Sequence, residues 1–179
     1  MKQFIFTLLL LTGVGTLLGF GQQDSMTTNS ILKGAIRIKA PASLLEMTPE
    51  MWELKYKMKQ RPELVLTNEE GTVNIILDYS EQKVNEAQIA AFTGFQAEQL
   101  TKARTDIKIL SKGTRKVNGK EIGFIKFSAK AIDQKIFNYY FFASYNGQLL
   151  LGSFNCVEKL QKEWEPIAEQ IVGSLQLGK

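Results

Sequence analysis

Residues 108–156 contain the sequence KILSKGTRKVNGKEIGFIKFSAKAIDQKIFNYYFFASYNGQLLLGSFNC, in which two Asn-Gly pairs separate segments rich in β-branched and aromatic residues. The pairs are Asn118-Gly119 and Asn146-Gly147, and Asn-Gly is the strongest short-range signal for a two-residue hairpin turn. The sequence therefore predicts four consecutive antiparallel strands, over residues 108–117, 120–129, 135–145 and 148–156.

The third of these segments is apolar on both of its faces. One face carries Ile136, Tyr140 and Phe142, and the other carries Phe137, Tyr139, Phe141 and Tyr145. The next segment has the same character, through Leu149, Leu150 and Leu151. A strand that is apolar on both faces is covered on both faces. The sequence therefore predicts an α+β fold, a three-layer α/β/α sandwich with a mainly antiparallel sheet and helices on both faces.

Two helices are expected before these four strands. Thr48 as the N-cap and Pro49 at the first helical position start the first helix, which Arg61-Pro62 ends. Its apolar residues recur at helical spacing, at Met51, Leu54 and Met58. Asn85 followed by Gln88 resembles a capping box at the start of the second helix. One face of that helix is expected to carry Ile89, Phe92, Phe95, Leu100 and Ala103.

Further strands and a closing helix complete the predicted order. Strands are expected over 35–39, 64–67 and 72–79, and the last two flank the loop Asn68-Glu69-Glu70-Gly71. The closing helix carries Val157, Leu160, Trp164, Ile167 and Ile171 at successive turns. Pro166 lies inside this pattern, so either the helix kinks there or its regular part begins near Glu163. Trp52 and Trp164 are interpreted as residues that pack helices on the sheet.

The N-terminal residues 1–21 have the features of a secretory signal peptide. Lys2 precedes a nearly uninterrupted apolar run, and Gly19 and Gly21 give a small-x-small cleavage site before Gln22. The alternative is an uncleaved anchor, although the run is short for a membrane span and contains three glycines. We expect an exported protein, periplasmic or secreted, without a stable membrane span after cleavage. Residues 22–33 are expected to be a flexible tether and residues 34–177 the folded domain.

Composition excludes several classes of function. The chain has 179 residues, one Cys and no His, which excludes serine triads, Cys–His dyads, His-ligated metals and an intrachain disulfide. A net charge of +4 with interleaved acidic and basic residues, and no binding motif, argues against nucleic-acid binding. Cys156 either pairs between chains in an oxidising compartment or is a small buried residue at a strand end, which is the commoner case.

The mature chain resembles the PsbP/MOG-like α/β/α sandwiches, in a secreted bacterial branch of largely uncharacterised members. The similar segments are Met47-Thr48-Pro49-Glu50-Met51, Lys55-Tyr56, Arg61-Pro62, Gly71-Thr72-Val73-Asn74-Ile75, Asn118-Gly119-Lys120, Ala131-Ile132-Asp133, Phe154-Asn155-Cys156, and Trp164 with Ser174-Leu175. The resemblance covers about residues 34–177. It implies docking to other proteins, as in the photosystem II subunit PsbP, a Ran-binding import factor and toxin chaperones. The histidines associated with metal in PsbP have no counterpart here.

These observations predict a non-enzymatic binding domain without a cofactor, metal or catalytic residues. The partner is expected to be another envelope or secreted protein. The alternative is an apolar, lipid-like ligand held between the sheet and a helix by the aromatic residues of 137–145. A third hypothesis, carboxylate catalysis, requires two acids in one cleft. Its candidates are Asp78, Asp106, Asp133, the pair Glu69 and Glu70, and the pair Glu163 and Glu165.

Two loops are predicted as docking sites. Glu69 and Glu70 lie in one hairpin loop, and Lys116 and Lys120 flank the tip of another hairpin with the opposite charge. Loop tips tolerate sequence change, so charge at these positions is free to serve recognition. The alternative is that both are solvated turns without a role.

Overall fold

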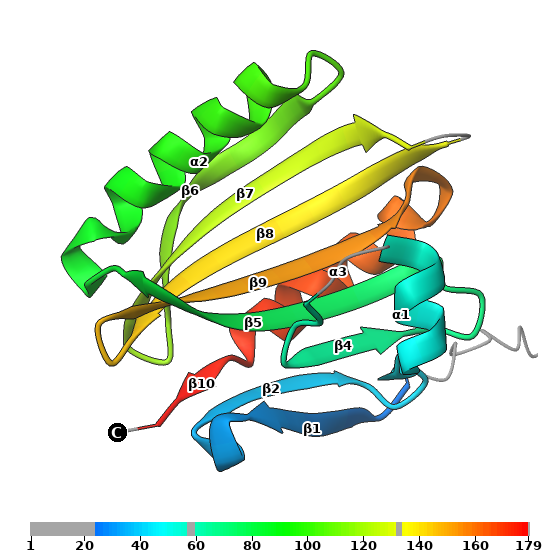
Figure 1. The fold of residues 1–179 in the computed structure, drawn as a ribbon, viewed down its shortest axis with the longest axis horizontal. Coiled ribbons are helices and arrows are strands. Elements are labelled where there is room, and N and C mark those ends of the chain that lie inside the picture. Colours follow the sequence, from blue (N-terminus) through cyan, green and yellow to red (C-terminus); the bar gives the residue numbers. More distant parts are fainter. Residues whose placement is uncertain (1–23, 57–59, 132–133, 179) are drawn as a thin grey trace, which may run out of the picture.

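The computed structural model describes residues 24–56, 60–131 and 134–178. Seven strands of this part of the chain form one sheet, and all of its pairings are antiparallel. Their spatial order is β3 (Leu45–Glu46), β4 (Leu64–Thr67), β5 (Val73–Lys83), β9 (Gln148–Val157), β8 (Lys135–Tyr145), β7 (Lys120–Lys130) and β6 (Lys108–Val117). Figure 1 shows this sheet face on.

The four-strand meander predicted from the two Asn-Gly pairs is confirmed. Asn118 and Gly119 have φ values of 48° and 83°, and Asn146 and Gly147 have 51° and 73°. A two-residue turn of this kind needs positive φ at both central residues, which Asn and Gly adopt at little cost. The observed strands agree with the predicted ones to within one residue at each end.

Three α-helices of the described residues cover the two faces of this sheet. Helix α1 (Pro49–Tyr56) and helix α2 (Ile89–Ala103) lie on one face, and helix α3 (Gln161–Gly173) lies on the other (Figure 1). Below α2 the core contains Ile125, Phe127 and Phe142, whereas the larger core on the α3 side contains Phe137, Phe141 and Phe154. The predicted three-layer α+β architecture is therefore present. None of the helices among the described residues is long and apolar enough to span a membrane.

Helix α2 begins as its sequence predicts. The side chain of Asn85 accepts a hydrogen bond from the backbone N–H of Gln88, and the Gln88 side chain accepts one from the backbone N–H of Asn85. A short 3₁₀ turn (Glu86–Gln88) leads from this capping box into the helix. In α3, Pro166 lies in the second turn, because the helix is already regular at Gln161. Of the two alternatives given for Pro166, a regular helix that starts only near Glu163 is therefore wrong.

The expected buried faces of α1 and α2 are partly wrong. In α1, Trp52 is buried and Leu54 is 81% exposed, and Met58 lies outside the described residues. In α2, Phe95 is 55% exposed and Ala103 is exposed, while Thr93 and Ala97 are buried. Thr93 can be buried because its hydroxyl donates a hydrogen bond to the carbonyl of Ile89, 2.8 Å away.

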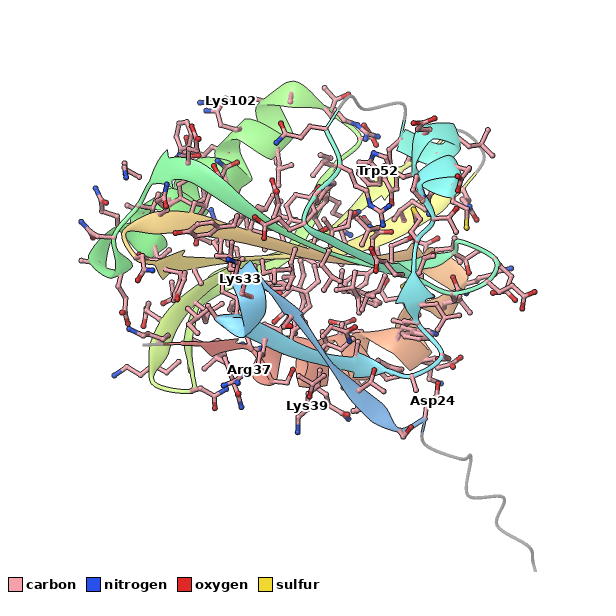
Figure 2. The ribbon with its side chains drawn as sticks, turned by 60° about the horizontal axis from the view of Figure 1, so that its bottom comes forward. Asp24, Lys33, Arg37, Lys39, Trp52 and Lys102 are labelled. Carbon is pink, nitrogen blue, oxygen red and sulfur yellow. The ribbon has the colours of Figure 1, made fainter. Side chains whose placement is uncertain are left out.

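A second, smaller sheet was not predicted. It has the order β1 (Met26–Ile31), β2 (Ile36–Pro41), β10 (Gln176–Leu177), and it lies on the α3 side of the molecule (Figure 1). The expected tether over 22–33 is therefore wrong for residues 26–33, which form β1 and the start of a 3₁₀ turn. Ile31 and Ile36 are buried in the larger core. Figure 2 shows Arg37 and Lys39 of β2 on the side of the molecule opposite Lys102 of α2.

Candidate functional site

The four predicted docking residues lie at opposite ends of the main sheet. Glu69 and Glu70 are exposed in the turn before β5. At this end of the sheet Val73 of β5 pairs with Cys156 of β9, which pairs in turn with Phe137 of β8. Lys116 and Lys120 flank the β6–β7 turn at the other end. The two charged tips therefore do not form one surface.

Each tip also makes local contacts. Glu70 accepts a hydrogen bond from Asn68 Nδ2 at 2.7 Å. Lys120 Nζ lies 3.4 Å from Glu86 Oε2, and Glu86 also accepts the backbone N–H of Glu121. These bonds lower the pKa of the Glu86 carboxyl, the backbone hydrogen bond from Glu121 being the main cause. Of the four predicted residues, only Lys120 makes an ion pair with a residue that the structure describes.

The predicted acidic candidates for catalysis do not converge on one cleft. Asp106 pairs with Arg104 at 2.7 Å and accepts the backbone N–H of Lys130, so it joins the chain after α2 to β7. Asp78 is half-buried on β5, and burial and the Asp78 charge together raise the pKa of the exposed Glu63 carboxyl. Asp133 lies outside the described residues. No group of three metal-ligating side chains occurs among the residues that the structure describes.

A charged cluster joins α3 to β6 and β7. Lys126 Nζ lies 2.7 Å from Glu165 Oε1 and also pairs with Glu169, which in turn pairs with Arg115 and accepts the hydroxyl of Tyr139 at 3.2 Å. Burial acts to raise the pKa of both glutamates, but the hydrogen bonds and charge of Lys126 outweigh it, so both pKa values are lowered. Every charge in this cluster has a partner, which is the pattern of a structural contact.

The interior residues have structural environments. Cys156 is fully buried, and burial raises the pKa of its thiol to about 12, so the interchain pairing considered for it is wrong. Trp52 is buried against Val65, and Trp164 stacks on Phe154 with ring centroids 6.2 Å apart, as predicted for packing residues. The aromatic residues proposed to line a ligand cavity fill the core instead. The structure therefore does not favour the apolar-ligand alternative.

Strand β6 forms a long, unpaired edge of the main sheet, which sequence reasoning did not identify as a site. It pairs with β7 on one side, and no other described strand lies beside it. Val117 and Lys120 flank the two-residue turn and exchange backbone hydrogen bonds. Because hydrogen-bonded and non-hydrogen-bonded pairs alternate, the backbone groups of Lys112, Thr114 and Lys116 point outward from the sheet.

A hollow lies between this edge and helix α2. Its volume is about 260 Å³, and it is lined by Ala90, Thr93 and Gly94 of α2 and by Lys112, Gly113 and Thr114 of β6. A Cβ placed on Gly94 meets nothing within 4 Å, so the small residues of α2 leave this space open. A second hollow of about 320 Å³ lies between α2 and the end of β5, and its lining includes Lys83, Phe92 and the exposed Phe95.

The β6 edge is strongly basic. The strand carries four basic residues and no acidic residue. Arg115 is engaged by Glu169, whereas Lys108, Lys112 and Lys116 form no ion pair with any described side chain. Lys112 and Lys116 lie on the same face as Thr114, because side chains alternate along a strand. The edge therefore presents outward backbone groups, an open hollow and two lysines without an ion pair on one side, and Glu121 of β7 lies opposite Lys116.

The comparisons with known proteins concern the fold. No protein-family model matches the sequence, and no curated protein matches it. Cyanobacterial PsbP (CyanoP) from Synechocystis sp. PCC 6803 is similar with a TM-score of 0.62 and 12% identity, covering 92% of this chain and 98% of its own. The Ran-binding protein Mog1p of Saccharomyces cerevisiae has a TM-score of 0.57 and 14% identity, covering 87% and 96%.

LpqN of Mycobacterium tuberculosis, described as involved in cell envelope biogenesis, has a TM-score of 0.55 and 9% identity, covering 89% of this chain and 88% of its own. All three alignments extend over nearly the whole described chain at very low identity, so they establish the fold and not the function. The chain therefore has the PsbP/MOG-like fold that its sequence resembles.

Proposed function

We propose that this chain is an exported, non-enzymatic domain that docks a partner protein in the cell envelope. The observation that carries the proposal is the β6 edge, whose outward backbone groups lie beside an open hollow and two lysines that form no ion pair with a described residue. A free strand edge of this length is a template for pairing with another chain. Mog1p, which shares the fold, is described as a Ran-binding protein, and this agrees with a docking role.

The non-enzymatic part of the proposal is supported by the acidic residues. Glu165 and Glu169 are neutralised by Lys126 and Arg115, and Asp106 is held by Arg104. The exposed pair Glu69 and Glu70 occupies a turn on the outside of the molecule. Catalysis by a carboxylate pair needs two acids that share one water-excluding cleft. Glu165 and Glu169 lie together on α3 but share the Lys126 ammonium group, and Asp106 and the Glu69–Glu70 turn lie on other elements.

Export is proposed from residues 1–21 and is tested by the mature N-terminus. We expect protein purified from its own host to begin at Gln22, as measured by intact mass and N-terminal sequencing. A chain that keeps residues 1–21 and sediments with the membrane fraction would contradict cleavage and support the uncleaved anchor.

Docking is tested by site-specific photo-cross-linking in the native host. A photoreactive amino acid replaces Thr114 on the β6 edge, and a matched control replaces Lys39, whose side chain is exposed on the small sheet away from α2 (Figure 2). We expect a protein adduct of constant mass at position 114 that excess purified wild-type domain competes away. The same adduct at both positions, or none at 114, would contradict docking through this edge.

The predicted loop residues enter this proposal unequally. Lys116 belongs to the β6 edge and is proposed as a contact, whereas Lys120 is engaged by Glu86. Glu69 and Glu70 lie at the other end of the sheet, and their role in docking stays a prediction. Reversal of their charge in Glu69→Lys/Glu70→Lys tests it, since an unchanged association rate at low salt would remove this turn from the interface.

A further inference from the structure

We propose that the β6–α2 groove binds an extended acidic segment of the partner, which adds to the sheet as an antiparallel strand beside β6. This inference rests on the proposed docking function and specifies its chemistry. The bound segment carries carboxylates two residues before and two residues after a small apolar residue. Three features of the edge determine this pattern: its outward backbone groups, the spacing of its lysines and the hollow between them.

The backbone determines where the added strand pairs. From Ser111 to Val117 the β6–β7 register is continuous, whereas a bulge interrupts it between Ile109 and Ser111. Within the continuous part, Thr114 has its N–H and C=O directed outward, with Lys112 and Lys116 as the next outward residues on either side. A residue opposite Thr114 can exchange two backbone hydrogen bonds with it, and this places Thr114 at the centre of the pairing.

The side chains determine the charge of the added strand. In an antiparallel pair, residues directly opposite one another lie on the same face, with Cβ atoms about 5 Å apart. The residues of the segment opposite Lys112 and Lys116 therefore face two ammonium groups that form no ion pair with a described carboxylate. Lys116 has Glu121 opposite it on β7, so Lys112 is the less compensated of the two. Glu or Asp at these two positions forms cross-strand ion pairs, whereas Lys or Arg there is repelled.

The hollow determines the residue between the two carboxylates. The side chain opposite Thr114 points to the α2 side, toward the space lined by Ala90, Thr93 and Gly94. The Thr93 hydroxyl already donates to the carbonyl of Ile89, so this wall offers no free donor. A small apolar side chain such as Val or Ala fits a space of about 260 Å³ with these walls.

Lysines along an exposed edge also prevent uncontrolled pairing between sheets. That effect is selective: it excludes neutral and basic strands, whereas an acidic strand is attracted. An edge that is only protected against pairing with other sheets needs charged side chains and no hollow. The hollow beside α2 therefore distinguishes the β6 edge from such an edge. The lysines and the hollow together favour one class of strand.

The inference is tested with peptides of defined sequence and the purified protein. The probe is Ser-Glu-Thr-Val-Thr-Glu-Ser, which has the same side-chain pattern in either direction. Its controls are the same peptide with Lys in place of both Glu, and the Glu peptide with a methyl group on the Val nitrogen. We expect the Glu probe to shift the backbone amide signals of Lys112, Thr114 and Lys116 in ¹H–¹⁵N spectra. We expect the Lys peptide not to bind.

The methylated peptide separates the effect of backbone hydrogen bonding on affinity from the effect of charge. It keeps both carboxylates but loses the donor opposite Thr114, so we expect its affinity to fall about tenfold. Thr114→Pro removes the outward N–H of the protein while leaving the ladder with β7 intact, and proline is tolerated at such edge positions. Thr114→Val keeps that N–H and is the matched control. We expect Thr114→Pro to weaken the Glu probe about tenfold and Thr114→Val to leave it near wild type.

Charge reversal gives the decisive comparison. The variant Lys112→Glu/Lys116→Glu is expected to lose the Glu probe and to bind the Lys peptide, because the cross-strand pairs are restored with exchanged signs. Equal affinity of wild type for both peptides, or equal affinity for the methylated and unmethylated probes, would overturn strand addition. If the Thr114 cross-link in the host persists while the peptides fail, docking through this edge stands and its strand-addition mode is wrong.

Discussion

Gly152 of β9 lies opposite Phe141 of β8, in the closest approach that a glycine makes in the larger core. A Cβ on Gly152 would lie 1.9 Å from the Phe141 ring, so the ring must move in a core that is already filled. We expect Gly152→Ala to lower the free energy of unfolding by about 2–3 kcal/mol in urea titrations. Gly94→Ala is the matched control, since its Cβ enters open space on a helix and should raise that free energy by about 0.5–1 kcal/mol.

The charged cluster around Lys126 makes stability depend on pH. The pKa values of Glu165 and Glu169 are lowered in the folded protein. The ionised carboxylates therefore add to the free energy of unfolding at pH values above the unfolded pKa of about 4.3. This contribution is lost as the pH falls through the lowered folded values. These side chains remain 33% and 35% exposed, and solvent screening reduces the contribution.

We therefore expect Lys126→Met to lower the free energy of unfolding at pH 7 by about 1–2 kcal/mol. We also expect its loss of stability between about pH 5 and 3 to be smaller than that of wild type. Denaturant titrations across this range give both quantities. Lys112→Met removes an exposed lysine without an ion pair and serves as the control. An acid transition identical to that of wild type would show that the cluster does not link protonation to folding.

At the scale of elements, local chemistry determines what the sequence predicts well. The Asn-Gly turns and the capping box of α2 each involve residues close in sequence, and all of them form as predicted. Which face of α1 and of α2 is buried depends on how each helix packs on the sheet. The periodicity of apolar residues in the sequence does not determine this packing. The sequence of β1, MTTNSI, contains a polar run without alternation, so its pairing with β2 comes from tertiary packing of Met26 and Ile31.

The capping box at Asn85 predicts a measurable loss when it is removed. We expect Asn85→Ala to lower the free energy of unfolding by about 1 kcal/mol, because the N–H of Gln88 loses its acceptor at the start of the helical segment. Asn85→Asp keeps an acceptor and should leave stability within a few tenths of a kcal/mol. Urea titrations measure both. Equal losses for the two variants would show that the side-chain acceptor does not stabilise this end.

At the scale of the whole molecule, the candidate site depends on the order of strands. The meander has two outer strands, β6 and β9, and its sequence does not show which of them pairs with β5. The structure pairs β9 with β5 along most of its length, so β6 is left at the edge. The basic residues of 108–117 are visible in the sequence, but their position on a free edge beside α2 follows only from this topology.

The small sheet closes the α3 side of the molecule, and this predicts where the folded unit begins. A chain that starts at residue 35 lacks β1, so β2 loses one neighbour and the core loses Ile31. Buried aliphatic side chains contribute about 1.5–3 kcal/mol each, and Met26 and Leu32 pack against the same core. We expect the chain starting at 35 to be less stable than one starting at 24 by at least about 2 kcal/mol in urea titrations. Equal midpoints and slopes for the two chains would mean that residues 24–34 behave as the tether their composition suggests.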